Sequence, residues 1–458
     1  MFKKVLIANR GEVAVRVIRA CREIGIPTVA VYSEADADSL HVSLATEAYC
    51  IGPAESAKSY LNIPAIISTA LISGADAIHP GYGFMSERAD FADICAQHGI
   101  KFIGPSGDAI RKMGDKAQAR ATMQEKDVPI TPGTGIVDDI GKAKRFCKKA
   151  GYPVIVKATA GGGGKGMRII NNESELEENI VLCKTEAQRF FGNPSVYIEK
   201  YLVNPRHIEV QILADKFGNV VYLGERDCSI QRRHQKLIEE APSPAVSEKI
   251  REKLGRTAVK AAKAVKYEGV GTVEFLLDKN NNFYFIEKKK KKMNTRLQVE
   301  HGITEMISNV DIVREQINIA AGKSISVAQR DIELKGHAIE CRINAEDPDK
   351  NFMPAAGQIN GYVAPGGFGV RVDSHVYSGY SIPPYYDSMI SKLMCWAPTR
   401  EEARRRMYRA LKEYVITGVK TTLPFYQDLI EDPVFTAGKI DTGFLEDYNK
   451  RKAEGKEK

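Results

Sequence analysis

The sequence predicts an α/β protein that begins with a doubly wound parallel sheet and becomes α+β in its C-terminal part. Strand and helix patterns alternate through the first hundred residues, and this alternation is typical of a parallel sheet covered by helices. A compact α/β unit follows to about residue 202, and it contains a glycine-rich segment between two strands. The remainder, to about residue 446, mixes one long helix with several strands.

The N-terminal elements follow from hydrophobic spacing. Residues 4–8 and 28–32 are short apolar runs, as in buried strands. Between them, apolar residues recur at helical spacing over 13–24. A second amphipathic helix is predicted over 66–71, and Gly74 ends it. No Gly-x-Gly-x-x-Gly follows the first strand, so a dinucleotide site is not predicted there.

The middle of the chain begins with a boundary near 113–135, where proline and glycine accompany polar residues. Strands are predicted over 154–159 and 167–170, and a helix over 176–190. A further helix is predicted over 247–265.

Composition excludes several classes of protein. The chain has 458 residues, 43% hydrophobic and 27% charged, as in a globular protein of about three domains. No run of about 18 apolar residues is present, so no membrane-spanning helix is predicted. The eight cysteines are scattered without a Cys-x-x-Cys pair, which favours thiols in the cytoplasm. Subtracting the five lysines at 288–292 from the net charge of +8 leaves +3, so nucleic-acid binding is not predicted.

A glycine-rich segment at 161–166 is the strongest local signal. Glycines let backbone N–H groups approach phosphate oxygens, and a lysine adds charge. The segment is not a Walker A loop, because Gly166 follows the lysine and a strand comes next. We expect a mobile flap over phosphates rather than a merely flexible hairpin tip. The flap residues are Gly161, Gly162, Gly163, Gly164, Lys165 and Gly166.

Two glutamates form the second signal. Residues 273–277 and 283–287 are predicted as strands of a hairpin, and a four-residue loop between them would place Glu274 directly opposite Glu287. Like charges paired across strands destabilise a sheet. A bound Mg²⁺ would reverse the sign, because carboxylate oxygens are its preferred ligands. The alternative is an edge pair that extends into water.

Two polar segments, 228–236 and 294–301, complete the set. Alternation along an extended strand would send Arg296, Gln298 and Glu300 to one side, where the carboxylate could act as a general base beside the arginine. The alternative is a surface ion pair of little consequence. The basic segment 228–236 is by itself equally typical of a solvated face.

Together these motifs resemble those of biotin carboxylases, which are members of the ATP-grasp family. The resemblance spans essentially the whole chain. It is carried by IANRGE at 7–12, HPGYGF at 79–84, RDCS at 226–229, QRRHQK at 231–236, NTR at 294–296, QVEH at 298–301 and PPYYDS at 383–388.

The resemblance implies an ATP-grasp fold with an N-terminal Rossmann-like domain, a mobile lid and a C-terminal mixed domain. The expected divisions are an N-terminal biotin carboxylase domain at 1–115, a lid with the flap at 116–202, a core with the metal site at 203–330, a C-terminal domain at 331–446 and a charged tail at 447–458.

The resemblance also implies residue roles. ATP would be bound by the flap together with Lys116, Lys157, Glu199, Lys200, Leu202, His207, Gln231 and His234. Magnesium or manganese would be held by Glu274, Glu287 and Asn294. Bicarbonate would be positioned by Lys236, Arg296, Gln298 and Val299. Glu300 would remove its proton, and Arg342 would stabilise the carboxyphosphate and the enolate form of biotin.

The implied reaction is the ATP- and bicarbonate-dependent carboxylation of biotin through carboxyphosphate. Because no Met-Lys-Met sequence is present, the biotin is expected on a separate carrier protein. A homodimer and a partner carboxyltransferase are also implied. The final acceptor, whether acetyl-CoA, propionyl-CoA or pyruvate, is left open.

Two features depart from the family pattern. The lysine run 288–292 lies between residues that are adjacent in the family, and in a continuous strand it would turn Asn294 to the opposite face. The run either loops out, or leaves a protein that binds ATP but is catalytically impaired, or is an engineered or erroneous insertion. An ATP-grasp ligase that joins a carboxylate to an amine is a further alternative. The second departure is Gly302, where the family usually has proline.

Overall fold

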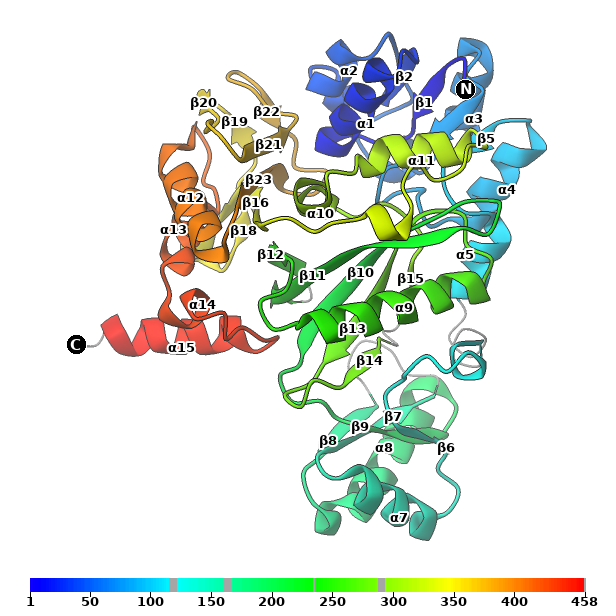
Figure 1. Cartoon of the computed structure of the whole chain (residues 1–458), viewed down its shortest axis with the longest axis vertical. Helices are drawn as coiled ribbons and strands as arrows, with labels where there is room; N and C mark the ends of the chain where they lie inside the picture. Colours follow the sequence, from blue (N-terminus) through cyan, green and yellow to red (C-terminus); the bar gives the residue numbers. More distant parts are fainter. Residues whose placement is uncertain (115–121, 160–165, 234, 287–292, 457–458) are drawn as a thin grey trace.

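The computed structural model describes residues 1–114, 122–159, 166–233, 235–286 and 293–456 (Figure 1). Its N-terminal part is a five-stranded parallel sheet in the order β3-β2-β1-β4-β5, which confirms the predicted doubly wound sheet. The strands are β1 (Val5–Ile7), β2 (Thr28–Tyr32), β3 (Glu47–Cys50), β4 (Ala77–His79) and β5 (Lys101–Phe102). The helices are α1 (Gly11–Glu23), α2 (Leu40–Leu44), α3 (Ile63–Ser73), α4 (Ala89–Gln97) and α5 (Gly107–Gly114).

Helix α3 illustrates how local chemistry sets the boundaries. The Asn62 side chain accepts a hydrogen bond from the Ala65 backbone, and Pro64 occupies the first turn. Gly74 ends the helix with a φ of 70°, a left-handed conformation that glycine adopts without steric cost.

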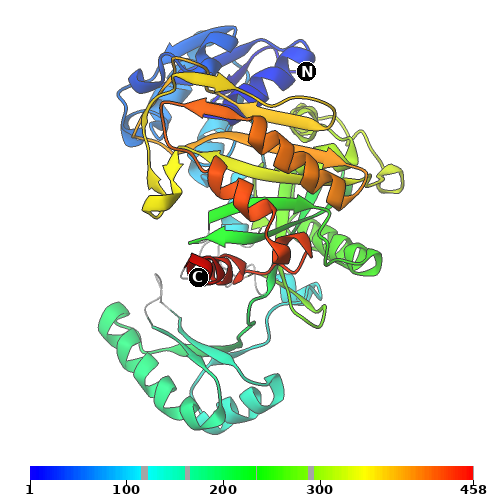
Figure 2. The same cartoon turned by 90° about the vertical axis from the view of Figure 1, so that its left-hand side faces the viewer.

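The lid is a four-stranded antiparallel sheet in the order β6-β9-β7-β8. It has a core of its own, built from side chains such as Val154, Ile180 and Ile198. Its strands are β6 (Gly133–Ile136), β7 (Val154–Ala158), β8 (Met167–Ile170) and β9 (Val196–Lys200), and its helices are α7 (Ile140–Ala150) and α8 (Leu176–Phe191). Figure 2 shows both helices on the side of this sheet that faces away from the rest of the molecule.

A nine-stranded antiparallel sheet forms the centre of the molecule. Its order is β14-β13-β10-β11-β12-β16-β23-β21, and β15 also pairs with β13. The strands are β10 (Arg206–Ala214), β11 (Val220–Arg232), β12 (Gln235–Ala241), β13 (Gly269–Leu277), β14 (Phe283–Phe285), β15 (Met293–Asn294), β16 (His337–Asn344), β21 (Val370–Ser374) and β23 (Met389–Ala397). The pairing of β12 with β16 makes one continuous sheet of the regions on either side of residue 331.

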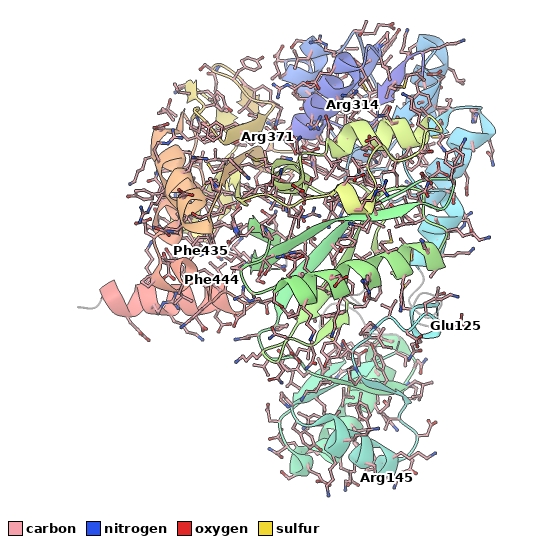
Figure 3. All side chains as sticks on the ribbon, viewed as in Figure 1. Glu125, Arg145, Arg314, Arg371, Phe435 and Phe444 are labelled. Carbon is pink, nitrogen blue, oxygen red and sulfur yellow. The ribbon has the colours of Figure 1, made fainter. Side chains whose placement is uncertain are left out.

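Helices and short ribbons cover this sheet. The helices are α9 (Glu248–Ala264), α10 (His301–Ser308), α11 (Ile312–Ala320), α12 (Arg400–Glu413), α13 (Leu423–Ile430), α14 (Pro433–Thr436) and α15 (Phe444–Lys456). The ribbons are formed by β17 (Glu346–Asp347), β18 (Met353–Pro354), β19 (Gly357–Gln358), β20 (Gly361–Val363), β22 (Ser381–Ile382) and β24 (Val415–Thr417). Phe435 and Phe444, labelled in Figure 3, belong to the apolar cluster that joins the C-terminal helices to the sheet. Among the described helices, none has the length and apolar character needed to cross a membrane.

The register of the β13–β14 hairpin differs from the predicted one by one residue. Leu277 pairs with Phe283, so Glu274 lies opposite Ile286 and not opposite Glu287. The turn is closed by the Asp278 side chain, which accepts hydrogen bonds from the Asn280 and Asn282 backbones. Glu287 itself lies outside the described residues.

The segment after β15 is not the extended strand that alternation predicts. Regular strand ends at Asn294, and Glu300 is the N-cap residue of α10. Asn294 does not lie on the opposite face, as it would in a continuous strand through the lysine run, because its Nδ2 donates to Glu274 Oε1 at 2.8 Å. β13 pairs Val273 with Met293, next to the position where Glu274 faces Ile286. The lysine run 288–292 lies outside the described residues.

Candidate active site

Five adjacent strands of the central sheet each contribute a charged side chain to one cluster. In sheet order these are Glu274 on β13, Glu209 on β10, Arg226 on β11, Lys236 on β12 and Arg342 on β16. All five belong to a network of buried ion pairs and hydrogen bonds. Glu300, from the start of α10, reaches the same network.

Glu300 lies between two cations and is only 2% exposed. One carboxylate oxygen is 2.5 Å from Lys236 Nζ, and the other accepts from Arg342 Nη2 at 2.9 Å. Burial alone would raise the pKa of Glu300, but Lys236, Arg342 and Arg226 outweigh it and hold that pKa well below the usual range. Strand alternation predicted Arg296 as the cation beside Glu300, but in the structure the neighbouring cations are Lys236 and Arg342, and Arg296 pairs with Glu87.

Two further buried carboxylates hold these cations in place. Glu209 pairs with Arg226 Nε at 2.5 Å and with Lys236 Nζ at 2.6 Å. Glu239 Oε1 accepts from Arg342 Nε at 2.7 Å. Arg226 also donates to Gln298 Oε1 at 2.8 Å. The sequence analysis missed both glutamates: Glu209 is the one acid of a largely apolar strand, and Glu239 lies at odd spacing from Lys236, where alternation indicates opposite faces.

The surroundings of Glu274 fit a divalent cation. Asn294 donates to Glu274 Oε1, Gln298 donates to the same oxygen at 3.4 Å, and His207 Nε2 is 3.5 Å from Oε2. Burial opposes ionisation, but His207, Lys236 and the Asn294 hydrogen bond together lower the pKa of Glu274. A carboxylate beside an amide oxygen is a donor set that Mg²⁺ and Mn²⁺ favour.

The predicted nucleotide residues lie on the lid and on the near edge of the central sheet. Lys157 on β7 pairs with Glu199 on β9. Lys200 Nζ donates to the backbone oxygens of Gly151 and Tyr152 at 2.8 and 3.2 Å. Leu202 is half-buried directly after β9.

On the central sheet, Gln231 Nε2 lies 2.6 Å from His207 Nδ1, which joins two of the predicted nucleotide residues. Gly166 has a φ of 67° and its backbone oxygen accepts from Ala158. The predicted residues Lys116, Gly161, Gly162, Gly163, Gly164, Lys165, His234 and Glu287 lie outside the described residues.

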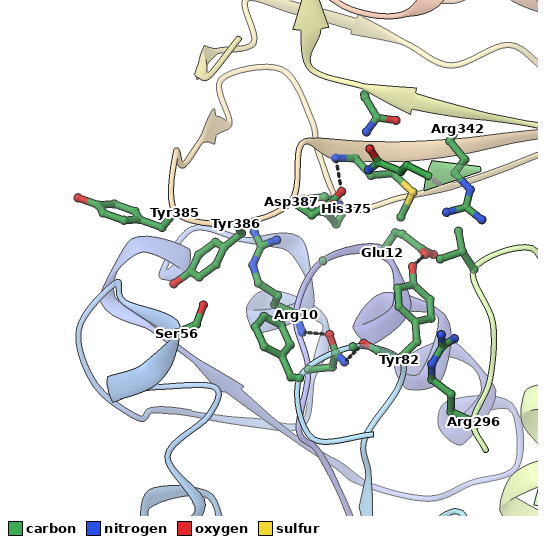
Figure 4. A pocket seen from close by; sticks show the side chains of 18 residues that line it. Arg10, Glu12, Ser56, Tyr82, Arg296, Arg342, His375, Tyr385, Tyr386 and Asp387 are labelled. Carbon is green, nitrogen blue, oxygen red and sulfur yellow. Dashed lines mark hydrogen bonds between the residues drawn. The ribbon is translucent and has the colours of Figure 1, made fainter. Parts of the chain in front are cut away.

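A cavity of about 520 Å³ opens beside Arg342, between the N-terminal sheet and the C-terminal part (Figure 4). Three predicted residues, Arg296, Val299 and Arg342, line one end of it. Arg296 Nε donates to Glu87 at 3.2 Å. Tyr82 donates from its hydroxyl to Glu12, and both side chains also line the cavity. The HPGYGF motif was noted in the sequence, but nothing in its spacing assigned a role to Tyr82.

The fold and the site define an ATP-dependent ligase of the ATP-grasp class. Family models match the chain at residues 1–110 as "Biotin carboxylase, N-terminal domain", at 115–328 as "Carbamoyl-phosphate synthase L chain, ATP binding domain" and at 340–447 as "Biotin carboxylase C-terminal domain". The chain belongs to the biotin carboxylase family.

Individual relatives agree over nearly the full length. The chain is 58% identical to biotin carboxylase 1 of Bacillus subtilis, with 98% of this chain and 99% of that protein covered. It is 56% identical to the biotin carboxylase of Haemophilus influenzae, with 97% and 98% covered. It is also similar, with a TM-score of 0.85, 52% identity and 98% of each chain covered, to the biotin carboxylase domain dimer of Hydrogenobacter thermophilus 2-oxoglutarate carboxylase, solved with MgADP, ADP and bicarbonate.

Proposed function

We propose that this chain carries out the first half-reaction of a biotin-dependent carboxylase, in which bicarbonate and ATP form carboxyphosphate and biotin on a carrier protein is carboxylated. The observation that carries the proposal is the position of Glu300. A buried, ionised carboxylate lies between two cations, with the Glu274 cluster on one side and a cavity large enough for a small ring on the other.

Glu300 is the proposed general base. Bicarbonate is a weak nucleophile, and loss of its proton makes it competent to attack the γ-phosphorus of ATP. In the unliganded site, Lys236 and Arg342 stabilise the ionised Glu300 and so weaken it as a base. When these cations turn to the negative charge of bicarbonate, Glu300 loses part of that stabilisation and its basicity rises. The same two side chains would therefore bind the substrate and activate the base.

Glu274 and Asn294, with Glu287, are the proposed ligands of Mg²⁺ or Mn²⁺. A divalent cation held there neutralises the charge of the nucleotide phosphates. For the nucleotide itself we assign Lys157, Glu199, Lys200, Leu202, His207 and Gln231, together with Lys116, His234 and the flap 161–166. The ion pair of Lys157 with Glu199 supports this assignment, because it presents a lysine ammonium on the lid sheet.

The cavity beside Arg342 is the proposed place of carboxyl transfer. The C–O bond of carboxyphosphate breaks there to give CO₂ and phosphate. The released phosphate takes the N–H proton of the biotin ureido group, and the nitrogen of the resulting enolate, which Arg342 holds, forms the new C–N bond with CO₂. Arg296, Gln298 and Val299 would position bicarbonate at the inner end. A site recessed between two parts of the molecule limits the access of water, which would otherwise consume the carboxyphosphate.

We assign the chain to a carboxylase of several subunits, with a biotin carrier protein and a carboxyltransferase as partners. Acetyl-CoA, propionyl-CoA and pyruvate are the candidate acceptors, which the carboxyltransferase would select. A homodimer is proposed as well, and Phe368, which at 79% exposure is the most exposed large apolar side chain among those described, is the contact residue to test. A cytoplasmic location is proposed from the unpaired cysteines, of which all but Cys50 are buried.

The test is an assay of radiolabelled bicarbonate incorporation into free biotin, with ATP cleavage measured in parallel. We expect ATP cleavage that requires bicarbonate, and labelled biotin that requires both. ATP cleavage that requires an amine and not bicarbonate would assign the chain to the carboxylate–amine ligases instead. ATP binding with no turnover would identify a catalytically impaired protein.

A further inference from the structure

Arg342 is held by two carboxylates at once. Its Nε donates to Glu239 Oε1 at 2.7 Å, and its Nη2 is 2.5 Å from the same oxygen and 2.9 Å from Glu300 Oε2. Among the described residues, no hydrogen-bond partner is found for its Nη1, and Arg342 lines the 520 Å³ cavity. One edge of the guanidinium is therefore fixed, and the other is available to a ligand.

A β-bulge in β12 makes this arrangement possible. Gln231 of β11 pairs with Lys236, but Ile230 pairs with Ile238, so Leu237 is an extra residue on β12. Leu237 and Ile238 both pack in the apolar cluster on the far side of the sheet. Lys236 and Glu239 consequently face the same side of the sheet, although they are three positions apart. Lys236 contacts the Glu300 carboxylate, and Glu239 contacts the Arg342 guanidinium.

A second glutamate, Glu340 of β16, lies directly opposite Glu239 in the β12–β16 ladder. Both are completely buried, and neither Glu340 oxygen has a hydrogen-bond partner among the described residues. Lys392 of β23 lies opposite Arg342 of β16 in the strand register, and its Nζ donates to the Val299 backbone oxygen and not to Glu340. Burial is the largest influence on this carboxyl and raises the pKa of Glu340 well above its usual range.

The charged groups around these two glutamates are two cations and several further acids. Arg342 and Lys392 face Glu340 from β16 and β23, Glu239 faces it from β12, and Glu300 approaches from the start of α10. Lys392 is also 3.4 Å from Glu12 and 3.7 Å from Asp373. Two ionised carboxylates facing each other in a dry ladder would be strongly destabilising. Burial raises the pKa of both acids, that of Glu239 to about 7, and the ion pair with Arg342 makes Glu239 the more readily ionised of the two.

We propose that Glu239 is a positioning residue for carboxyl transfer, which fixes the Arg342 guanidinium so that its free edge points at the biotin enolate, while Glu340, which has no hydrogen-bond partner among the described residues, leaves Arg342 to Glu239 and Glu300. A guanidinium locked at Nε and Nη2 loses little freedom when it meets a ligand. This inference rests on the proposed function, in which Arg342 holds the enolate.

The experiment compares the full chain with Glu239→Gln, Glu340→Gln, Arg342→Ala and the double variant Glu239→Gln/Arg342→Ala. Two rates are measured for each: free-biotin carboxylation, and bicarbonate-dependent ATP cleavage without biotin. We expect Glu239→Gln to lower carboxylation by about 10-fold or more and ATP cleavage by much less. In the Arg342→Ala background the same change should add nothing, because a residue that acts through Arg342 has no effect without it.

Glu340→Gln is the matched control, since it makes the same acid-to-amide change, at the same size, in the facing side chain. We expect its two rates and its thermal midpoint to equal those of the unmodified chain. A loss as large as that of Glu239→Gln would mean that Glu340 is charged, and the assignment would be overturned.

Arg342→Lys provides a second test that does not alter Glu239. Lysine keeps the charge but cannot make the two-point contact with Glu239. We expect it to lower carboxylation more than ATP cleavage, as Glu239→Gln does.

The outcomes separate this inference from the function on which it rests. If Arg342→Ala carboxylates biotin normally, the proposed role of Arg342 fails. If Arg342→Ala is impaired but Glu239→Gln keeps both rates, only the positioning role of Glu239 is overturned. The same holds if the loss of carboxylation rate caused by Glu239→Gln adds to the loss caused by Arg342→Ala.

Discussion

Two carboxylates of the site, Glu274 and Glu300, differ in their neighbours. Among the described residues, the ion-pair partners of Glu300 are the cations Lys236 and Arg342. Glu274 is surrounded by an amide, an imidazole and, at 3.7 Å, the Lys236 ammonium. The first environment suits an acid that exchanges a proton with an anionic substrate, and the second suits an acid that holds a metal ion.

The base assignment leads to a prediction for Glu300→Gln. The amide keeps the size of the side chain but cannot accept a proton from bicarbonate. We expect bicarbonate-dependent ATP cleavage to fall by at least about 100-fold, while the affinity for ATP changes little. Steady-state ATP cleavage and equilibrium nucleotide binding are the measurements. Loss of nucleotide affinity with intact turnover would assign Glu300 to the ATP site.

The space that a side chain at position 302 would occupy is filled by a neighbouring residue. A Cβ added there would collide with the sulfur of Met394, which is completely buried against α10. We expect Gly302→Ala alone to lower the free energy of unfolding by about 1–3 kcal/mol. With Met394→Val the alanine gains room, so the double variant should be more stable than the sum of the two changes predicts. Denaturant unfolding of all four proteins measures this coupling, and simple additivity would contradict it.

At this scale the sequence identified Glu274, Arg296, Gln298, Glu300 and Arg342 as site residues but not what orients them. The spacing of residues along the sequence shows only which residue types recur at which intervals. It does not report that Glu209 on β10 contacts Lys236, which lies two strands away in the sheet. For Glu239 the local pattern was misleading, because uninterrupted alternation puts it on the face opposite Lys236.

At the scale of elements, the strands and helices of the N-terminal part were predictable because their apolar spacing is regular. Residues 28–32 form β2, and the helix expected over 13–24 is α1. Errors arose where side chains rather than apolar spacing set the backbone. Asp278 closes its turn in a register one residue from the predicted one, and the chain leaves the sheet after Asn294 to begin α10 at His301.

The β13 ladder makes a prediction for the lysine run. Because Ile286 and Met293 face neighbouring positions of β13, deletion of 288–292 would leave one residue, Glu287, between them, as in a β-bulge. We expect the deletion variant to fold with unchanged cooperativity. Its affinity for MgATP should be close to that of the unmodified chain at high salt. The two affinities should differ most at low salt, where the five ammonium charges of the unmodified chain act most strongly on a cation site. Calorimetric titration at two salt concentrations measures this.

A control for the deletion replaces the five lysines with a neutral Gly-Ser segment of equal length. If charge is responsible, the neutral segment should match the deletion in MgATP affinity. If the neutral segment instead matches the unmodified chain, segment length and not charge governs the site.

At the scale of the whole molecule, Glu240 ties the central sheet to the C-terminal helices. It accepts from His337 of β16 at 2.9 Å and from both Nε and Nη2 of Arg400 in α12. Burial opposes ionisation of Glu240, but His337 and Arg400 lower its pKa to about 2. Because the unfolded chain has the usual value near 4.3, this carboxylate stabilises the fold by roughly 3 kcal/mol above that pH.

That stabilisation should be lost in acid. A lowered folded-state pKa means that the contribution is complete above about pH 4.5 and disappears as the pH falls toward 2. We therefore expect the stability advantage of the unmodified chain over Glu240→Gln to be smaller at pH 3.5 than at pH 6. Urea unfolding at the two pH values measures it, and an equal advantage at both would contradict the assignment.

Self-association is predicted to depend on Phe368. The ring lies against Trp396 and beneath Arg406 and is otherwise exposed. We expect Phe368→Glu to shift the sedimentation profile from dimer to monomer with an unchanged unfolding midpoint. An unchanged profile would place the dimer contact elsewhere.

One charged residue on each of five neighbouring strands, from Glu274 on β13 to Arg342 on β16, forms a row whose backbone length is set by the spacing of the strands. Neighbouring strands are spaced by about 4.8 Å, so four intervals separate the two backbones by about 19 Å. The hydrogen bonds of the ladder hold these backbones apart, but the side chains converge. Lys236 Nζ lies 3.7 Å from Glu274 and 2.5 Å from Glu300, and the other oxygen of Glu300 is 2.9 Å from Arg342. A ligand of only a few ångströms can therefore touch groups carried by widely separated strands.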